Sequence, residues 1–375
     1  MPIKLKDLHL KPSRAKRKEP LWAGPQNDGP MGGVTFSMLS NYLCDKERFR
    51  LKVIEGLRAV GKFNVPIEFG NMWHVCEEEY AAKKPFQARL KEYVIKLCKE
   101  YKQDQDIINH WYNVILKQFP MYIEYWSKHE HRTGCVPIYQ EKIFHIPIEL
   151  PLHGEIYLRG KWDSVDYVKG QGIYVQENKT KSEINEAKLM SQLMFDLQTM
   201  LYVYTVQQSM KSDPKLGKYE KEGIRGVRYN VIRRDCPIRR HKAKKSSPEE
   251  TIQHYYNRLY VDYFQANPEE WFGRWDVVIT DNDIEFFTKK CLIPVLENIC
   301  SDYDWWNYCI RNNVDVFDTL ERCKVFKNPP QHYIYPFGIR NILDEGGSTE
   351  LDNYLMTGSI VGLEYTDIMF RELQP

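Results

Sequence analysis

The spacing of apolar residues changes along the chain, from a helical period to the alternation of strands and back again. Over residues 37–57 the apolar side chains recur at every third or fourth position, which predicts a helix. Residues 67–80, 86–103 and 105–127 are amphipathic and aromatic and predict three more helices. The first third of the chain is therefore expected to be helical.

Period-two patterning follows in residues 138–148 and 154–180, which are rich in Ile, Val, Tyr and Phe. The sequence Lys169-Gly170-Gln171-Gly172 interrupts the second stretch as a turn, so two strands joined by a hairpin are expected there. A long helix is predicted over residues 184–210 and another strand over residues 226–233. Helices, then a meander of strands, then a helix and a strand predict an α/β or α+β domain.

A third region begins with a helix signal. Ser247-Pro248-Glu249-Glu250 has the form of a capping box with proline in the first helical position, and it predicts a helix to about Phe264. Residues 273–280 predict a short strand and residues 283–310 a helix. The remainder is expected to belong to a mixed C-terminal lobe.

Composition narrows the class of protein. With 42% hydrophobic residues the chain is too apolar to be disordered. No apolar run approaches the length of a membrane span, and no apolar stretch separates the N-terminal charges from Pro20 as a secretory signal would, so a cytoplasmic protein without a membrane partner is expected. None of the nine cysteines forms a C-x-x-C pair, which argues for reduced, mostly buried thiols rather than a zinc ribbon.

The net charge is only +2, but positive charge is concentrated in two segments. Such segments suit a polyphosphate partner, although each alone is better explained as a solvated tail or loop. The first segment consists of Lys4, Lys6, Lys11, Arg14, Lys16, Arg17 and Lys18, and the second of Arg233, Arg234, Arg239, Arg240, Lys242, Lys244 and Lys245.

The predicted hairpin carries the most informative chemistry. Asp163 lies seven residues before Gly170 and Glu177 seven residues after it, so a turn centred there sets the two carboxylates opposite each other, with Cβ atoms about 5 Å apart. Lys179 shares the face of Glu177. Two such carboxylates suit Mg²⁺, which supports phosphodiester hydrolysis by activating water and neutralising charge, and a lysine adds charge stabilisation. Salt bridges on a solvated sheet explain the same spacing.

Two helical patterns add to this group. Gly70, His74 and Glu78 lie along one helix face; imidazole is a competent metal ligand, and a carboxylate nearby could fix its tautomer. Glycine there would permit close approach of another backbone. Gln198 and Tyr202 are four residues apart on the predicted helix after the hairpin, where they could contact nucleic acid. Taken singly, the histidine and the tyrosine are as well explained by packing.

In combination these segments resemble the ordered motifs of RecB-family nucleases, which belong to the PD-(D/E)XK superfamily. The resemblance covers about residues 35–205, and each motif alone is weak. The segments are Ser37–Cys44 followed by Arg48-Phe49, Gly70-x-x-x-His74-x-x-x-Glu78, Gly160–Asp166, Glu177-Asn178-Lys179-Thr180 and Gln198-x-x-x-Tyr202.

The resemblance implies a restriction-endonuclease-like core, a central mixed sheet flanked by helices in αβββαβ order. It implies that His74, Asp163, Glu177 and the main-chain carbonyl of Asn178 hold one or two Mg²⁺ or Mn²⁺ ions. Asp163, Glu177 and Lys179 would be the catalytic residues. The expected contacts with DNA are Gln198, Tyr202, Tyr42, Thr180, Arg239 and Arg240.

Some relatives in that family carry an iron–sulfur cluster, bound by one cysteine near the first helix and three near the C-terminus. Cys44 stands at a suitable first position, but no closely spaced trio follows it, and residues 329–344 contain no cysteine. We therefore expect no iron–sulfur cluster.

The leading hypothesis is a metal-dependent DNA nuclease, most simply an exonuclease acting on DNA ends or single strands. The alternatives are a structure-specific endonuclease and a nucleic-acid-binding subunit of a recombination or defence complex built on the same fold. The expected organisation is a basic arm over residues 1–33, a nuclease core over 34–235 with a helical insertion at about 80–130, and a C-terminal helical or mixed lobe over 246–375.

Overall fold

The computed structural model describes residues 20–44, 46–59, 63–129, 135–193, 196–235, 238–242, 248–312 and 363–365. These residues form two compact units. Unit 1 draws on residues 1–60, 143–160 and 286–375, and unit 2 on residues 61–142 and 161–285. Most of the predicted basic arm (residues 1–19) and much of the predicted C-terminal lobe (residues 313–362 and 366–375) lie outside the described residues.

Unit 2 begins with the three helices that the hydrophobic periodicity predicts. They are α3 (Val65–Ala81), α4 (Phe86–Glu100) and α5 (Gln105–Lys128). Asn64 caps α3 by accepting a hydrogen bond from the N–H of Ile67 at 3.4 Å, and proline in the first turn costs the helix no hydrogen bond. Their apolar faces meet in an aromatic core in which Trp73, Phe119 and Tyr122 are each almost fully buried.

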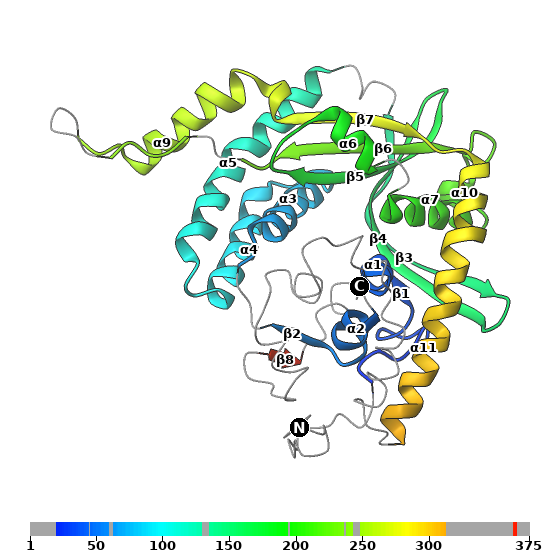
Figure 1. Cartoon of the computed structure of the whole chain (residues 1–375). Helices are drawn as coiled ribbons and strands as arrows, with labels where there is room; N and C mark the ends of the chain where they lie inside the picture. Colours follow the sequence, from blue (N-terminus) through cyan, green and yellow to red (C-terminus); the bar gives the residue numbers. More distant parts are fainter. Residues whose placement is uncertain are drawn as a thin grey trace, which may run out of the picture. The chain divides into compact units, whose positions relative to one another are not determined.

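The sheet is mixed, as the fold-class prediction requires. It contains β4 (Gly154–Val168), β5 (Gly172–Lys181), β6 (Ile224–Arg233) and β7 (Phe272–Val278). Strand β5 is antiparallel to β4 and parallel to β6, and β7 is antiparallel to β6; β3 (Cys135–Leu150) also pairs with β4. In Figure 1, β5, β6 and β7 run side by side, with α3, α4 and α5 gathered next to them. The chain is therefore a mixed α/β protein whose central sheet is flanked by helices.

The hairpin between β4 and β5 has the predicted register. The paired residues run from Val168 opposite Gly172 to Ser164 opposite Gln176, and Gly170 in the turn has a φ of 77°, which favours glycine. The predicted register is therefore confirmed as far as Ser164 and Gln176, and Asp163 and Glu177 are the next residues on the two strands.

Helices cover both faces of this sheet. The Lys179 side chain bonds to Gln198 of α7 (Leu197–Ser209), whereas Asn178 bonds to Glu77 of α3. Adjacent residues of a strand point to opposite faces, so α7 and α3 lie on opposite faces of β5. This arrangement brings side chains from two helices to the end of one hairpin.

Two helix predictions in unit 2 are wrong in detail. The helix predicted over residues 184–210 is split into α6 (Glu186–Leu193) and α7, because the Asp196 side chain accepts from the N–H of Thr199 and starts a new helix. The helix predicted from Ser247 begins later, as α9 (Ile252–Leu259), and is capped by Thr251, while Ser247 itself lies outside the described residues. Glu250 instead accepts from Arg258 and His254.

Unit 1 contains the predicted opening helix in shortened form. Its first elements are β1 (Val34–Thr35), α1 (Phe36–Cys44), α2 (Lys46–Phe49), the π-helical η2 (Arg50–Ile54) and β2 (Leu57–Ala59). The helix predicted over residues 37–57 is therefore wrong at its C-terminal end. Gly56, with a φ of 68°, takes the left-handed conformation that ends helices.

Strand pairing in unit 1 is limited to short segments. Val34 and Thr35 of β1 pair in parallel with Leu158 and Arg159 of β4, and β2 is antiparallel to β8 (Leu363–Tyr365). The remaining elements of the chain are α8 (Pro214–Gly217), η4 (Tyr260–Gln265), η5 (Pro268–Glu270), α10 (Asp281–Phe287), η6 (Thr288–Leu292) and α11 (Ile293–Arg311). None of the described helices combines the length and apolar composition needed to cross a bilayer.

Candidate functional site

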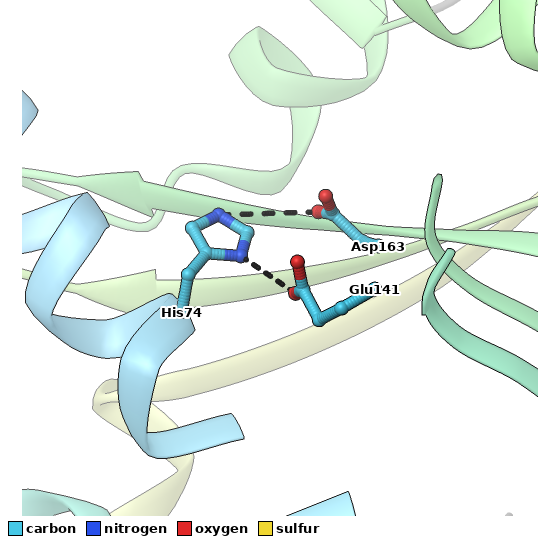
Figure 2. Close-up of side chains that lie close together, drawn as sticks. All are labelled: His74, Glu141 and Asp163. Carbon is cyan, nitrogen blue, oxygen red and sulfur yellow. Dashed lines mark hydrogen bonds and ion pairs between the residues drawn. The ribbon is translucent and has the colours of Figure 1, made fainter. Parts of the chain in front are cut away.

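Three side chains from three elements of unit 2 converge beside the hairpin. His74 projects from α3, Glu141 from β3 and Asp163 from β4, as Figure 2 shows. One ligand-type atom of each residue lies within 4.8 Å of the others. Such a set of one imidazole nitrogen and two carboxylate oxygens can bind a divalent cation.

The imidazole of His74 bridges the two acids. Its Nδ1 lies 3.2 Å from Glu141 Oε1, and its Nε2 lies 4.0 Å from Asp163 Oδ2. Burial alone would lower the pKa of His74, but the charges of Asp163 and Glu141 outweigh it and raise the pKa to about 10. At neutral pH this raised pKa leaves both ring nitrogens protonated. A cation would displace the proton of Nε2 while Nδ1–H goes on donating a hydrogen bond to Glu141, which is the tautomer that a metal ligand requires.

Glu141 is the member of this group that the sequence motifs do not reveal. It has a φ of 48° within β3, and its carboxylate also lies 2.5 Å from the ammonium of Lys161. Positive φ is rare for a side chain of this kind and marks an irregularity in the strand. A single polar residue in an alternating strand gives no sign of such a bend. The only signal for Glu141 in the sequence is its place in the strand predicted over residues 138–148.

Asp163 is held from the neighbouring strand. Its Oδ2 accepts from the main-chain N–H of Asn178 at 2.9 Å, and the side chain is almost fully buried. Burial raises the pKa of this carboxyl. The Asn178 side chain is itself fixed, since it donates to Glu77 at 2.8 Å and accepts from Asn230 at 2.8 Å. The backbone that supports Asp163 is therefore anchored on its far side.

Glu177 and Lys179 form the adjacent part of the site. Lys179 Nζ donates to Glu177 Oε1 at 2.7 Å, while Glu177 Oε2 is buried and has no hydrogen-bond partner among the described residues. Burial and the charge of Asp163 raise the pKa of Glu177 to about 8. Burial opposes the charged form of Lys179, but Glu177 and Asp196 outweigh it and raise the pKa of the ammonium.

Gln198 and Tyr202 continue this group onto α7. Gln198 Oε1 accepts from Lys179 Nζ at 2.6 Å, and Gln198 Nε2 donates to the hydroxyl of Tyr202 at 3.3 Å. Tyr202 is largely buried. The predicted pair thus positions the lysine in this structure, and the contact with DNA stays a prediction.

Four further residues are expected contacts with DNA. Thr180 is half-buried near α3, and Arg239 and Arg240 are exposed after β6, where Arg240 pairs with Glu249. Tyr42 belongs to unit 1, where it donates to Asp302 at 2.6 Å. Their roles toward a substrate stay predictions.

Two details of the helix pattern differ from expectation. The carboxylate beside His74 is Glu141, and Glu78 on the same helix is exposed. An added Cβ at Gly70 would lie 3.6 Å from Thr180 Oγ1, an ordinary contact distance, so the fold does not require glycine there.

The donor set fits a divalent cation. Carboxylate oxygens of Asp163 and Glu177 are hard ligands, and the neutral imidazole of His74 is compatible with Mg²⁺ or Mn²⁺ in a mixed site. The strongest sign is Glu177 Oε2, because a buried carboxylate oxygen without a partner is costly unless something binds it. Asp163 and Glu177 repel each other, which a cation would also relieve.

The described cysteines at positions 76, 98, 135, 291 and 300 form no disulfide bond. Residues 329–344, the segment that corresponds to the C-terminal cluster cysteines of some relatives, lie outside the described residues. The expectation of no iron–sulfur cluster stays a prediction.

Comparison with known families agrees with the site. The family model described as the PD-(D/E)XK nuclease superfamily matches residues 34–277, about two thirds of the chain, and includes every residue of the group around His74 and Lys179. No curated protein matches the chain.

Proposed function

Because the chain belongs to the PD-(D/E)XK nuclease superfamily, and is thus a metal-dependent nuclease, we propose that it is a Mg²⁺- or Mn²⁺-dependent deoxyribonuclease. We propose further that it is a RecB-like exonuclease, acting at DNA ends or on single strands. The observation that carries the proposal is the continuous group formed by His74, Asp163, Glu177, Lys179 and Gln198 at one end of the hairpin.

Each side chain has a distinct part in this proposal. Asp163 and Glu177, with His74, would hold the cation, and Glu141 would orient the imidazole. A divalent cation in this position supplies a more acidic water and neutralises charge on the phosphate. The carboxylate of Asp163 is fixed by the main-chain N–H of Asn178.

Lys179 is positioned to stabilise the charge that develops on the phosphate. Glu177 and Gln198 hold its ammonium at 2.7 and 2.6 Å, and the pKa of the ammonium is raised, so the group stays protonated at neutral pH. A fixed cation costs little reorganisation during the reaction, which is the basis of electrostatic catalysis. Gln198 and Tyr202 act through this lysine as positioning residues.

Binding of a DNA backbone is supported by charge outside the site. Arg239 and Arg240 are exposed on the segment that follows β6, where they can contact the phosphates of a strand without reading its sequence. The amide and phenol pair of α7 supports the RecB-like assignment.

Digestion of labelled DNA tests the proposal. Purified protein with Mg²⁺ is expected to release label progressively from the ends of linear single- or double-stranded DNA and to leave closed circular DNA intact. Cleavage of the circle would show an endonuclease instead. Binding of DNA without cleavage under Mg²⁺ and Mn²⁺ would favour a binding subunit. RNA of the same sequence is the control for the sugar.

A further inference from the structure

A cavity of about 610 Å³ lies within unit 2, next to the group around His74 but separate from it. Its volume falls in the range of small-molecule sites. Glu77, Tyr80 and Lys84 of the α3 end line one wall, and Gln176 and Arg228 of the sheet line another. No role in metal binding or in holding Lys179 has been assigned to this space.

The walls of the cavity are predominantly cationic. Lys83, Lys84, Arg228 and Arg274 contribute four positive charges, against the carboxylates of Glu77 and Asp166. The two lysines are exposed at the end of α3. Burial raises the pKa of Asp166, which weakens the negative contribution of that residue.

Both arginines are fixed before any ligand arrives. Arg228 donates from Nε and Nη2 to Asp276 at 2.8 and 2.9 Å, which offsets its charge in part, and its guanidinium lies over the ring of Tyr174. The guanidinium of Arg274 lies 3.9 Å from the ring centre of Trp126. The fork of Arg228 is thus already filled by a carboxylate, and the two guanidinium groups contribute fixed positive charge to the walls.

The same cavity offers groups that suit a nucleobase. The ring of Tyr80 is partly exposed, with a relative accessibility of 39%, and provides a face for stacking. The side-chain amides of Gln140 and Gln176 also line the cavity. Their Nε2 groups donate to Ser164, Asp166 and Asn178, so their carbonyl oxygens are the atoms offered to the N–H groups of a base. A simple anion would need the cations alone, whereas the ring and the two amides match the base of a nucleotide.

The cavity is connected to the metal-binding group through α3. His74 and Glu77 are one turn apart, and Tyr80 follows on the next turn, about 9 Å along the helix from His74 (6 residues at about 1.5 Å). Lys83 and Lys84 come just after α3, which ends at Ala81. Glu77 Oε2 accepts from the side chain of Asn178, whose main-chain N–H holds Asp163. Asn178 therefore links Glu77 in the wall of the cavity to the metal-binding carboxylate of Asp163.

We propose that this cavity is a nucleotide subsite, which receives one nucleotide of the bound strand on the face of the sheet that α3 covers. Lys83 and Lys84 contact its phosphate, Tyr80 stacks on its base, and Gln140 and Gln176 bond to the base edge. This inference rests on the proposed nuclease function, because the strand that fills the cavity is the substrate of that function.

The test is photo-crosslinking in EDTA, so that no cleavage is needed. A short single-stranded DNA carrying 5-iodouracil at each position in turn is irradiated with the full-length protein, and the attached peptide is identified by mass spectrometry. The proposal expects one position of the strand to crosslink to Tyr80, with loss of that crosslink in Tyr80→Leu. Crosslinks found only outside the cavity would overturn it.

Affinity measurements give a second readout. In Lys83→Ala/Lys84→Ala, the dependence of log affinity on log salt for the same oligonucleotide should fall by about 1.4, since each phosphate contact on a single strand contributes about 0.7. The matched control Lys96→Ala/Lys99→Ala removes two exposed lysines from α4 and should leave the slope unchanged. Equal slopes in wild type and in the Lys83/Lys84 variant would overturn the phosphate contacts.

Thymidine monophosphate distinguishes a strand from a free nucleotide. Competition of the mononucleotide with the Tyr80 crosslink supports the subsite. Binding of the mononucleotide in the cavity without competition would overturn strand binding there. The failure of the nuclease function is seen separately, as absence of cleavage by wild type, whatever the crosslinking result.

Discussion

Glu141 offers a sharp test of how the site is built, because it touches both His74 and Lys161 and is not part of any sequence motif. Glu141→Gln keeps the size of the side chain and an oxygen that can accept from His74 Nδ1, but it removes the charge. Loss of a partner that orients a ligating histidine typically lowers metal affinity about 10–100-fold. That range corresponds to about 1.4–2.8 kcal/mol of binding free energy.

The assay is titration with Mn²⁺, followed by electron paramagnetic resonance of the free ion, beside DNA cleavage at increasing Mg²⁺. The variant should bind Mn²⁺ about 10–100-fold more weakly, and cleavage should recover when Mg²⁺ is raised by the same factor. Lys161 is 38% exposed, so loss of its ion pair should cost at most about 1 kcal/mol of stability.

Glu149→Gln is the matched control, since Glu149 lies on the same strand and is exposed. It should bind Mn²⁺ as wild type does. Unchanged Mn²⁺ affinity in Glu141→Gln, with the fold intact, would refute the reasoning that Glu141 orients His74.

Three further predictions follow from single contacts. Lys179→Met should lower the cleavage rate about 10²–10³-fold at saturating Mg²⁺, as loss of one preorganised donor does; a single-turnover rate within threefold of wild type would contradict the role of the ammonium. Gly70→Ala should raise the free energy of urea unfolding by up to about 1 kcal/mol, because α3 has room for the methyl group; a loss of stability would show that this space is absent. Burial raises the pKa of Asp166 in the folded protein, so its stability cost grows as pH rises above the unfolded value and vanishes in acid. Asp166→Asn should therefore gain more melting temperature over wild type at pH 8 than at pH 4, and an equal gain at both would be inconsistent with that cause.

Local patterns were sufficient for much of the fold. The helices α3, α4 and α5 follow from apolar spacing, and the hairpin register that leads to Asp163 and Glu177 follows from counting outward from Gly170. A hairpin register depends on the turn and on the alternation of nearby residues, both of which are written in a short segment.

Other features depend on contacts that a single segment does not contain. The end of the opening helix depends on the conformation of Gly56, and the break before α7 depends on the Asp196 cap, which competed with a continuous apolar pattern. Glu141 meets His74 only because β3 passes α3, with 66 residues between them in sequence. Gln198 is expected at the substrate, but its hydrogen bond to Lys179 depends on the packing of α7 against β5, which neither segment specifies alone.

The central claim is that Asp163 holds the cation on which hydrolysis depends. The most direct measurement is Mg²⁺-dependent hydrolysis of end-labelled linear DNA by wild type and by Asp163→Ala, at equal concentration and with matching circular dichroism spectra. The account predicts degradation by wild type that EDTA stops, and none by the variant. Degradation by Asp163→Ala at the wild-type rate would contradict it.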